Sequence, residues 1–379
     1  MSSSAGKLGA IALFWMAIGL IQTFNWGNGI PKAFVMLLVL TAAPLVLAAA
    51  RRSVPPSPAF ARAVNIAFWI ALTLNLVYFG ARIIHPHIID IGLTTLTAGK
   101  ALLQGLNPYA LPIDTGPESF GITGYKYLPM MIIDYLPLGT PFDQRGVQIT
   151  NLLLLLACLW LMKRIAGTKL APLLLLMLPL VAEQIFAKGA TDLAAVVPLL
   201  GALALVERNS FWCGVCVGLS IATKLLPGVA MLPALIPPQR RAAFIAGVVI
   251  GGLPVLPFVL MRPAAFWYNI VLFNLWRLPD STSWLQAMPA AVATAAHLLF
   301  IAVMLAAALY VWRRSPPTIA RAALAAMLGI AAILAGPGAH HNYQLWWMPF
   351  YALMLALALA PAGGRASPLR EPNAGLAAP

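Results

Sequence analysis

The stretch LQAMPAAVATAAHLLFIAVMLAAALYVWRR, residues 285–314, decides the fold class. Residues 285–312 contain no lysine, arginine, aspartate or glutamate, and Arg313 and Arg314 follow directly. A helix of about 20 mainly apolar residues is long enough to cross the hydrocarbon core of a membrane. The stretch is therefore predicted to be a transmembrane helix, and its two arginines are typical of a cytoplasmic end.

The composition of the whole chain agrees with this stretch. Of 379 residues, 61% are hydrophobic and 9% are charged, whereas a soluble domain is about 45–50% apolar and about 25% charged. A single soluble domain of this length cannot bury so much apolar surface, so lipid must cover it. The net charge is +14, and the basic residues lie in short clusters between apolar runs. This pattern is typical of cytoplasmic loops and argues against a nucleic-acid partner. We therefore predict an all-α, polytopic transmembrane protein.

Similar apolar runs occur along most of the chain. Two shorter runs, 211–222 and 225–237, meet at Lys224 and are either two short spans or one broken hairpin. The total is about 10–12 spans. Apolar runs of spanning length lie near 9–25, 33–50, 63–84, 146–162, 170–187, 190–206, 242–260, 285–312, 318–335 and 344–361.

The basic residues predict the orientation of these spans, because cytoplasmic loops carry an excess of lysine and arginine. With twelve spans, all basic clusters face the cytoplasm, and segments 85–145, 261–284 and 336–343 lie outside. The chain is then a single transmembrane domain, 1–362, with a disordered cytoplasmic tail, 363–379. The clusters are Arg51, Arg52 and Arg62; Lys163, Arg164 and Lys169; Arg208; Arg240 and Arg241; Arg313, Arg314 and Arg321; and Arg365 and Arg370.

The segment 85–145 is the longest one predicted outside, and it is too long for a plain connector. Residues 92–104 are predicted to form a helix on the outer surface. Residues 127–139 are apolar but short and contain two prolines, which favours an interfacial or re-entrant helix. The segment also holds half of the chain's ten acids: Asp90, Asp114, Glu118, Asp134 and Asp143.

Asp90 is the first candidate for chemistry, because it follows a span directly in Ile88-Ile-Asp-Ile-Gly92. An acid among isoleucines at the membrane surface is placed to act as a partly desolvated general base. The alternative is structural, because aspartate is also a good N-cap for the helix that follows. The Asn107-Pro-Tyr109 sequence after Gly105 is, from its residue types, a turn that ends that helix.

The remaining candidates are basic or aromatic residues near the outer segments. Lys224 lies between two apolar half-helices, where a lysine is costly unless it snorkels or meets an anion such as phosphate. His340 and His341 precede Tyr343, and this cluster can hydrogen-bond a phosphate or a sugar hydroxyl. Two histidines without a paired acid are weak evidence for a metal. Arg277 lies in an aromatic segment that suits sugar and phosphate contact or simple interfacial anchoring. The cysteines, Cys158, Cys213 and Cys216, are interpreted as packing residues.

In their order along the chain, these motifs resemble the GT-C membrane glycosyltransferases that use polyprenyl-phosphate sugars, and most closely glycosyltransferase family 87, an α-mannosyltransferase-like group. The likeness covers most of residues 85–360. Leu128 departs from the family pattern, which has a proline there. The matching elements are Asp90, the KALLQGLNPY sequence of residues 100–109, Tyr125-Lys-Tyr-Leu-Pro129, Lys224 with Pro227, and His341 with Tyr343.

The resemblance implies an inverting transfer of a hexose, expected to be mannose, from a polyprenyl-phosphate sugar to a lipid- or polymer-linked acceptor outside the cytoplasm. Asp90 is then the catalytic base. Lys224, Arg277, His340, His341 and Tyr343 bind the donor's phosphate or sugar, and Asn107, Tyr109 and Tyr127 form the loop motif. No cofactor and no metal are expected. The location implied is the bacterial inner membrane, with the active site on its extracytoplasmic side and membrane lipids as partners.

Two other classes of function compete with this interpretation. About twelve spans are also typical of a secondary transporter, but transporters usually show repeat symmetry and ionisable residues at mid-membrane. The chain has no apparent repeat, and its acids gather in the segments predicted outside. The other class is a non-catalytic scaffold or lipid-binding subunit.

Overall fold

The computed structural model describes residues 58–114, 122–273 and 277–359. The predicted spans 9–25 and 33–50 and the tail 363–379 lie outside the described residues. Most of the described chain is helical. The helices are accompanied by one antiparallel pair of two-residue strands, β1 (Ile113–Asp114) and β2 (Ile122–Thr123).

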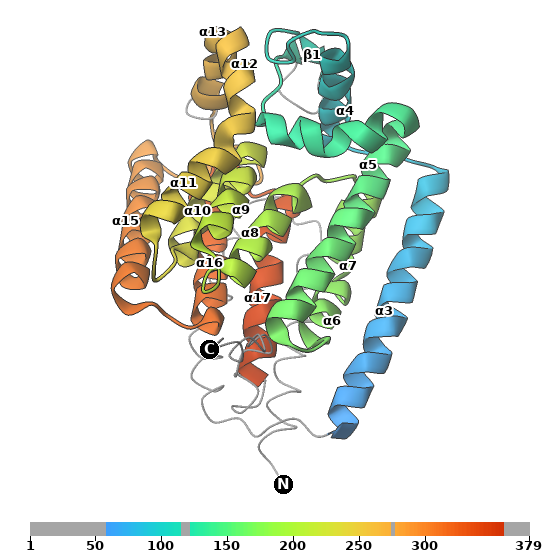
Figure 1. Cartoon of the computed structure of the whole chain (residues 1–379). Coiled ribbons are helices and arrows are strands. Elements are labelled where there is room, and N and C mark those ends of the chain that lie inside the picture. Colours follow the sequence, from blue (N-terminus) through green and yellow to red (C-terminus); the bar gives the residue numbers. More distant parts are fainter. Residues whose placement is uncertain (1–57, 115–121, 274–276, 360–379) are drawn as a thin grey trace, which may run out of the picture.

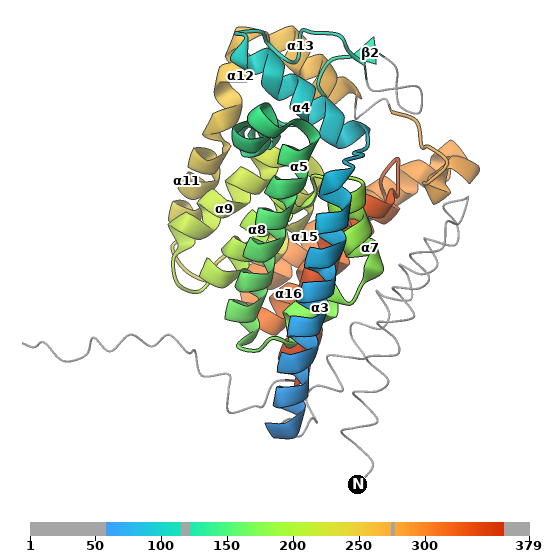
Figure 2. The same cartoon turned by 90° about the vertical axis from the view of Figure 1, so that its right-hand side faces the viewer.

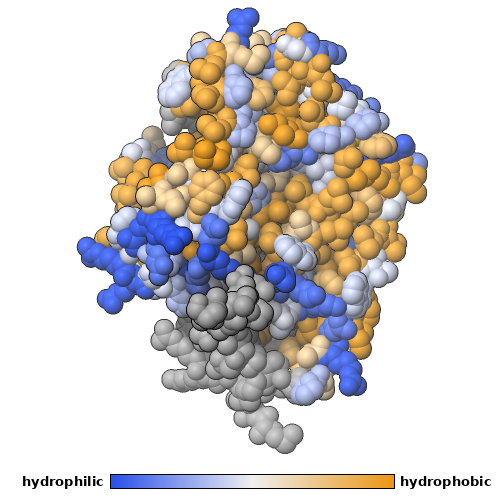
Figure 3. Space-filling view, in the orientation of Figure 1, coloured by the Kyte–Doolittle hydropathy of each residue, from blue (hydrophilic) through white to orange (hydrophobic). Residues whose placement is uncertain are grey.

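Within the described ranges, four helices are long and apolar enough to cross a membrane. They are α3 (Pro58–Ile84), α5 (Pro129–Ala166), the continuous stretch Arg241–Met261, and α15 (Ala290–Arg314). The third comprises α11 (Arg241–Gly252), η3 (Leu253–Val255) and α12 (Leu256–Met261). Large apolar side chains on α3 and α15 are exposed, and Figure 3 shows hydrophobic residues over much of one face. Such a surface needs lipid, so the chain is an integral membrane protein, as predicted.

The centre of the bundle is formed by shorter helices and α17 (Gln344–Leu359). Almost every residue of α17 is buried, including Trp346 and Trp347, because α16 (Thr318–Leu334), α5, α8 (Leu193–Leu205) and α6 (Leu170–Leu176) pack around it. The predicted single span 170–187 is broken. It consists of α6 and of α7 (Pro179–Ala182) with η1 (Glu183–Ala187), bent by 71°. Pro179 accounts for the break, since proline cannot donate the next helical hydrogen bond.

The short runs 211–222 and 225–237 form a hairpin. The first arm is α9 (Ser210–Thr223), and the second is α10 (Leu225–Met231) continued by η2 (Leu232–Leu235). The Ser210 hydroxyl donates to the Gln239 carbonyl at 2.9 Å, and Cys213 Sγ lies 3.5 Å from the Leu235 carbonyl. The arms are therefore antiparallel, and Lys224 lies at the tip.

Closely spaced glycines allow α9 to pack directly on α11. A Cβ atom at Gly214 would lie 2.0 Å from the Phe244 carbonyl oxygen, and one at Gly251 would lie 2.3 Å from the Val215 carbonyl oxygen. Small residues four apart are the usual way for helices to approach closely in a membrane. This packing fixes the hairpin, and therefore Lys224, against a long membrane helix.

One end of the bundle is covered by surface helices (Figures 1 and 2). They are α4 (Asp90–Leu103), the first part of α5, and α13 (Pro263–Trp267), which η4 (Tyr268–Leu272) continues. The predicted helices at 92–104 and 127–139 are both present. The second joins the spanning part of α5 across a kink at Asp143, where φ is 55°.

The opposite end carries the connections from α5 to α6 and from α15 to α16 (Figure 1). The last turns of α5 and α15 contain Lys163 with Arg164 and Arg313 with Arg314. These basic residues and the surface helices thus lie at opposite ends, as the predicted orientation requires. Which end faces the cytoplasm stays a prediction.

Arg321 belongs to a basic cluster that is predicted to face the cytoplasm, but it differs from a typical loop residue. Its side chain is buried and donates to the carbonyls of Ala234, Ile236 and Pro316 at 2.7–2.9 Å. Two of these carbonyls end the η2 segment, where no helical partner remains for them. Arg321 therefore provides hydrogen-bond donors for the carbonyl groups at the buried end of η2. Cys158 and Cys213 are buried packing residues, as predicted.

Candidate functional site

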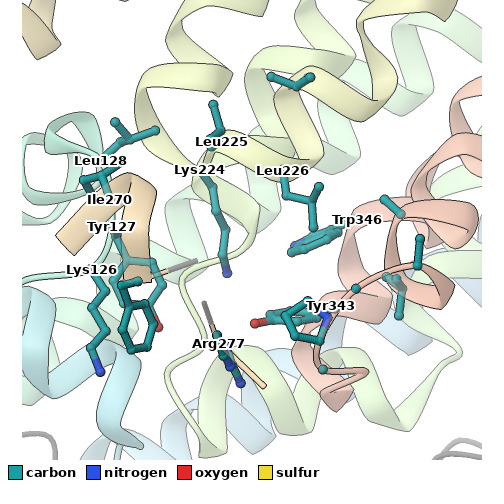
Figure 4. A pocket seen from close by; sticks show the side chains of 18 of the residues that line it. Lys126, Tyr127, Leu128, Lys224, Leu225, Leu226, Ile270, Arg277, Tyr343 and Trp346 are labelled. Carbon is teal, nitrogen blue, oxygen red and sulfur yellow. The ribbon is translucent and has the colours of Figure 1, made fainter. Parts of the chain in front are cut away.

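A cavity of about 440 Å³ opens beneath the surface helices and gathers most of the residues that the sequence singled out. It is lined by parts of α4, the 124–128 segment, α10, α15, α16 and the start of α17. Asp90, Tyr127, Lys224, Arg277 and Tyr343 all line it. Figure 4 shows four of these with Lys126 and Trp346 around a common space.

Asp90 is the first residue of α4 and reaches the cavity from its end. The N-cap position belongs to Ile89, and within the described part of the chain the Asp90 carboxylate accepts one hydrogen bond, from the Ile91 amide, at 2.8 Å. Asp90 is exposed, whereas its isoleucine neighbours had predicted partial burial. The backbone before it is held by a 2.9 Å bond from the Ile89 amide to the Lys188 carbonyl. The chain thus presents an accessible carboxylate on a fixed backbone.

Lys224 is not the lone cation that the sequence predicted. Its ammonium lies 2.5 Å from Asp192 Oδ1, and the two side chains are 9% and 0% exposed. Asp192 also accepts from the Asn342 amide at 2.7 Å and from the Trp346 indole at 2.6 Å. A buried ammonium needs such a partner because the protein interior does not solvate it. One carboxylate therefore joins the start of α8, the hairpin tip and the start of α17.

Three aromatic rings surround the Lys224 ammonium. It lies 5.1 Å from the ring centre of Tyr343 and 5.5 Å from those of Tyr127 and Trp346. The Tyr343 and Trp346 rings stack at 4.4 Å. These distances allow favourable cation–π contact, and the rings give this part of the cavity flat apolar walls.

Arg277 lies across the cavity and is oriented by Asp280. Its guanidinium donates to Asp280 Oδ2 at 2.6 Å and lies 3.2 Å from His340 Nε2, while His340 lies 3.0 Å from the same carboxylate. Burial raises the pKa of Asp280, but hydrogen bonds from His340 and Thr282 outweigh this effect and hold that pKa well below its ordinary value. His340 therefore supports Arg277 and does not line the cavity itself.

Lys126 is a cation of the cavity to which the sequence interpretation gave no role. Its ammonium lies 4.1 Å from the ring centre of Phe273. Burial and the nearby charge of Arg277 lower the pKa of Lys126 to about 8, although Asp90 acts in the opposite direction. Two cations that repel each other beside one cavity are typical of an anion-binding site.

Asn107 and Tyr109 of the loop motif hold one wall of the cavity in place through hydrogen bonds. Asn107 Oδ1 accepts from the Tyr109 amide at 2.9 Å, which is a local turn, and the Tyr109 hydroxyl donates to the Tyr127 carbonyl at 2.7 Å. The Asn269 amide in turn donates to the Tyr109 carbonyl at 3.0 Å. Asn107 and Tyr109 do not line the cavity. They fix the segment that presents Lys126 and Tyr127.

The structure adds Asp192 and Lys126 to the predicted residues. Asp192 could have been recognised from the sequence, since an acid at the start of an apolar run of spanning length requires a buried partner. His341 lies in η6 (His341–Tyr343), outside the cavity lining. Among the described residues, no three histidine, cysteine, aspartate or glutamate side chains gather as metal ligands. The metal-free site stays a prediction.

The helical architecture and the cavity beneath the surface helices define a polytopic membrane protein with a candidate binding site at one end of its helix bundle. Among solved structures, the fold is similar to that of ArnT from Cupriavidus metallidurans, crystallised with undecaprenyl phosphate, with a TM-score of 0.52 and 14% sequence identity. The match covers 76% of this chain and 59% of the ArnT chain, so the chain spans less than two thirds of that relative.

A model of glycosyltransferase family 87 matches residues 126–337. This is more than half of the 379 residues, and the chain belongs to this family. The resemblance predicted from the motifs is thereby confirmed, as is the helical GT-C-like fold. No protein of curated function matches the chain at a significant level.

Proposed function

We propose that this chain transfers a hexose from a polyprenyl-phosphate sugar to a hydroxyl of a lipid- or polymer-linked acceptor, on the extracytoplasmic side of a bacterial inner membrane. The single observation that carries the proposal is the cavity in which the accessible carboxylate of Asp90 is combined with the cations Lys126 and Arg277. Membership of glycosyltransferase family 87 and a fold shared with a protein crystallised with undecaprenyl phosphate support this class of donor.

Asp90 acts as the general base in the proposed reaction. It takes the proton from the acceptor hydroxyl, and the oxygen forms a bond to the anomeric carbon of the sugar. The bond between that carbon and the phosphate oxygen breaks at the same time, so polyprenyl phosphate leaves with its electron pair and the configuration inverts. Asp90 suits this role because it lines the cavity and, among the residues that the structure describes, accepts one local hydrogen bond.

Lys126 and Arg277 stabilise the departing phosphate. A phosphate leaving group needs cations to hold its charge more than it needs a proton donor. Arg277 presents a planar guanidinium, which suits phosphate oxygens, and Asp280 and His340 hold it in place. Tyr343 lines the same cavity, whereas His341 lies outside its lining. Mannose is the first sugar to test because of the family likeness.

The proposal is tested with purified protein in proteoliposomes and a panel of radiolabelled polyprenyl-phosphate sugars, with an envelope lipid extract as acceptor. Wild-type protein should form a labelled glycolipid. Asp90→Asn should lose about 10²–10⁴ in rate, the usual contribution of a general base, while it still binds donor. Asp143→Asn is the matched control, because Asp143 is an exposed acid paired with Lys100. Near-normal transfer by a stable Asp90→Asn protein would remove Asp90 from catalysis.

A further inference from the structure

Lys224 and Arg277 are each paired with a carboxylate, but Asp192 is fully buried, whereas Asp280, the partner of Arg277, is 23% exposed to solvent. An anion that approached the ammonium would also approach Asp192 Oδ1, which lies 2.5 Å from it and is fully buried. Repulsion by this carboxylate cancels most of the attraction that a phosphate would feel. A neutral ligand with hydroxyl groups meets no such repulsion.

Lys224 also has donors to offer to a neutral ligand. An ammonium has three N–H groups, and among the described residues its hydrogen-bond partner is Asp192. The side chain is 9% exposed and lines the cavity. Two N–H groups can therefore be directed towards oxygens of a bound molecule.

The aromatic rings around Lys224 add apolar walls to its hydrogen-bonding groups. Tyr343 and Trp346 stack at 4.4 Å, and Tyr127 contacts the ammonium from another side. A pyranose ring has a C–H face that packs on apolar aromatic walls and hydroxyl groups at its edge that need hydrogen-bond partners. Binding pockets for small molecules typically combine such walls with a few fixed polar groups.

We propose that the Lys224–Asp192 pair, with the rings of Tyr127, Tyr343 and Trp346, forms the subsite for the sugar ring of the donor, and that the donor phosphate binds apart from it at Lys126 and Arg277. Asp192 is a positioning residue, since it holds the ammonium in place. This inference rests on the proposed function, and it assigns Lys224 to the sugar although the sequence had suggested phosphate.

The test compares the binding of two lipids, polyprenyl phosphate and polyprenyl-phosphate mannose, to purified protein in nanodiscs. The double variant Asp192→Asn/Lys224→Gln keeps two hydrogen-bonding groups and leaves no unpaired buried charge. Its affinity for the mannosylated lipid should fall about tenfold, while its affinity for polyprenyl phosphate should stay within about twofold. The matched control Lys126→Met should weaken both lipids by a similar factor. If the double variant weakens both lipids equally, or neither, the sugar subsite is refuted.

Two further measurements test the sugar subsite. If the double variant does not fold, Tyr343→Leu replaces it and should show the same selective loss of the mannosylated lipid. If wild-type protein shows no preference for the mannosylated lipid, the subsite is refuted even where transfer is observed. If wild-type protein shows the preference but transfers no sugar, the proposed function is refuted and the subsite is supported.

Discussion

The buried pair Lys224–Asp192 allows a quantitative prediction about stability. Its ammonium and carboxylate atoms are 2.5 Å apart, and the two side chains are 9% and 0% exposed. Coulomb attraction at this distance is about 6–7 kcal/mol for an effective dielectric constant of about 20, and most of it offsets the desolvation of the two ions. Removing only one partner leaves a buried charge, which typically costs about 3–5 kcal/mol in the free energy of unfolding.

We expect the loss in free energy of unfolding of each single variant to lie near the lower end of that range. In Lys224→Met, Asp192 keeps the donors Asn342 and Trp346. In Asp192→Asn, Lys224 keeps its three aromatic neighbours. Each single variant should therefore lose about 3 kcal/mol. The loss in the double variant should be smaller than the sum of the two single losses by at least about 2 kcal/mol, because the double variant contains no isolated buried charge.

The assay is a double-mutant cycle on the free energy of unfolding, measured by SDS titration in mixed micelles. The exposed pair Lys100–Asp143 is a matched control, since its atoms are also 2.5 Å apart but its side chains are 47% and 67% exposed. Solvent screens that pair, and its coupling should be at most about 1 kcal/mol. Additive losses at Lys224 and Asp192, or equal couplings for both pairs, would refute the argument that burial makes the first pair interdependent.

Three further predictions concern the segment that presents Lys126. Affinity for polyprenyl phosphate should fall about tenfold between pH 7 and pH 9, because the pKa of Lys126 is about 8 and the amine is neutral above it; Lys126→Arg should remove this dependence in a binding titration at constant ionic strength. Tyr109→Phe loses the bond to the Tyr127 carbonyl and should cost about 1 kcal/mol in the free energy of unfolding, together with a raised donor KM. Gly124→Ala should cost about 1–3 kcal/mol, because its Cβ would lie 2.7 Å from the Tyr109 carbonyl oxygen; Gly252→Ala, with no atom within 4 Å, should be neutral in the same unfolding titration.

The sequence alone predicted the helices that are marked by a continuous apolar run or by regular apolar spacing. Apolar length predicted α3, α11 with α12, and α15, and the helix at 92–104 followed from its apolar spacing after Asp90. The bend between α6 and α7 was missed, because 170–187 is apolar throughout and Pro179 alone does not show whether a membrane helix kinks or breaks. The packing of α9 on α11 depends on glycines more than thirty residues apart, which only the folded chain brings together.

The site was predictable as a set of residues but not as a set of contacts. Asp90, Lys224 and Tyr343 were selected because each stands out in its own segment, and the cavity brings them together. The partner of Lys224 lies 32 positions earlier in the chain, and no local pattern connects the two. Lys126 appeared within the Tyr125–Pro129 motif, but its importance comes from Arg277, on a distant segment.

The distribution of charge in the cavity matches the movement of charge in the proposed reaction. Arg277 and Lys224 each form a pair with a carboxylate, Asp280 and Asp192. A sugar phosphodiester carries one negative charge, and the released phosphate monoester carries up to two, while Asp90 becomes neutral as it takes the proton. Transfer therefore moves one negative charge from Asp90 towards Lys126 and Arg277. Groups placed where charge develops stabilise the transition state more than the bound donor, so these two cations should affect kcat as well as donor binding.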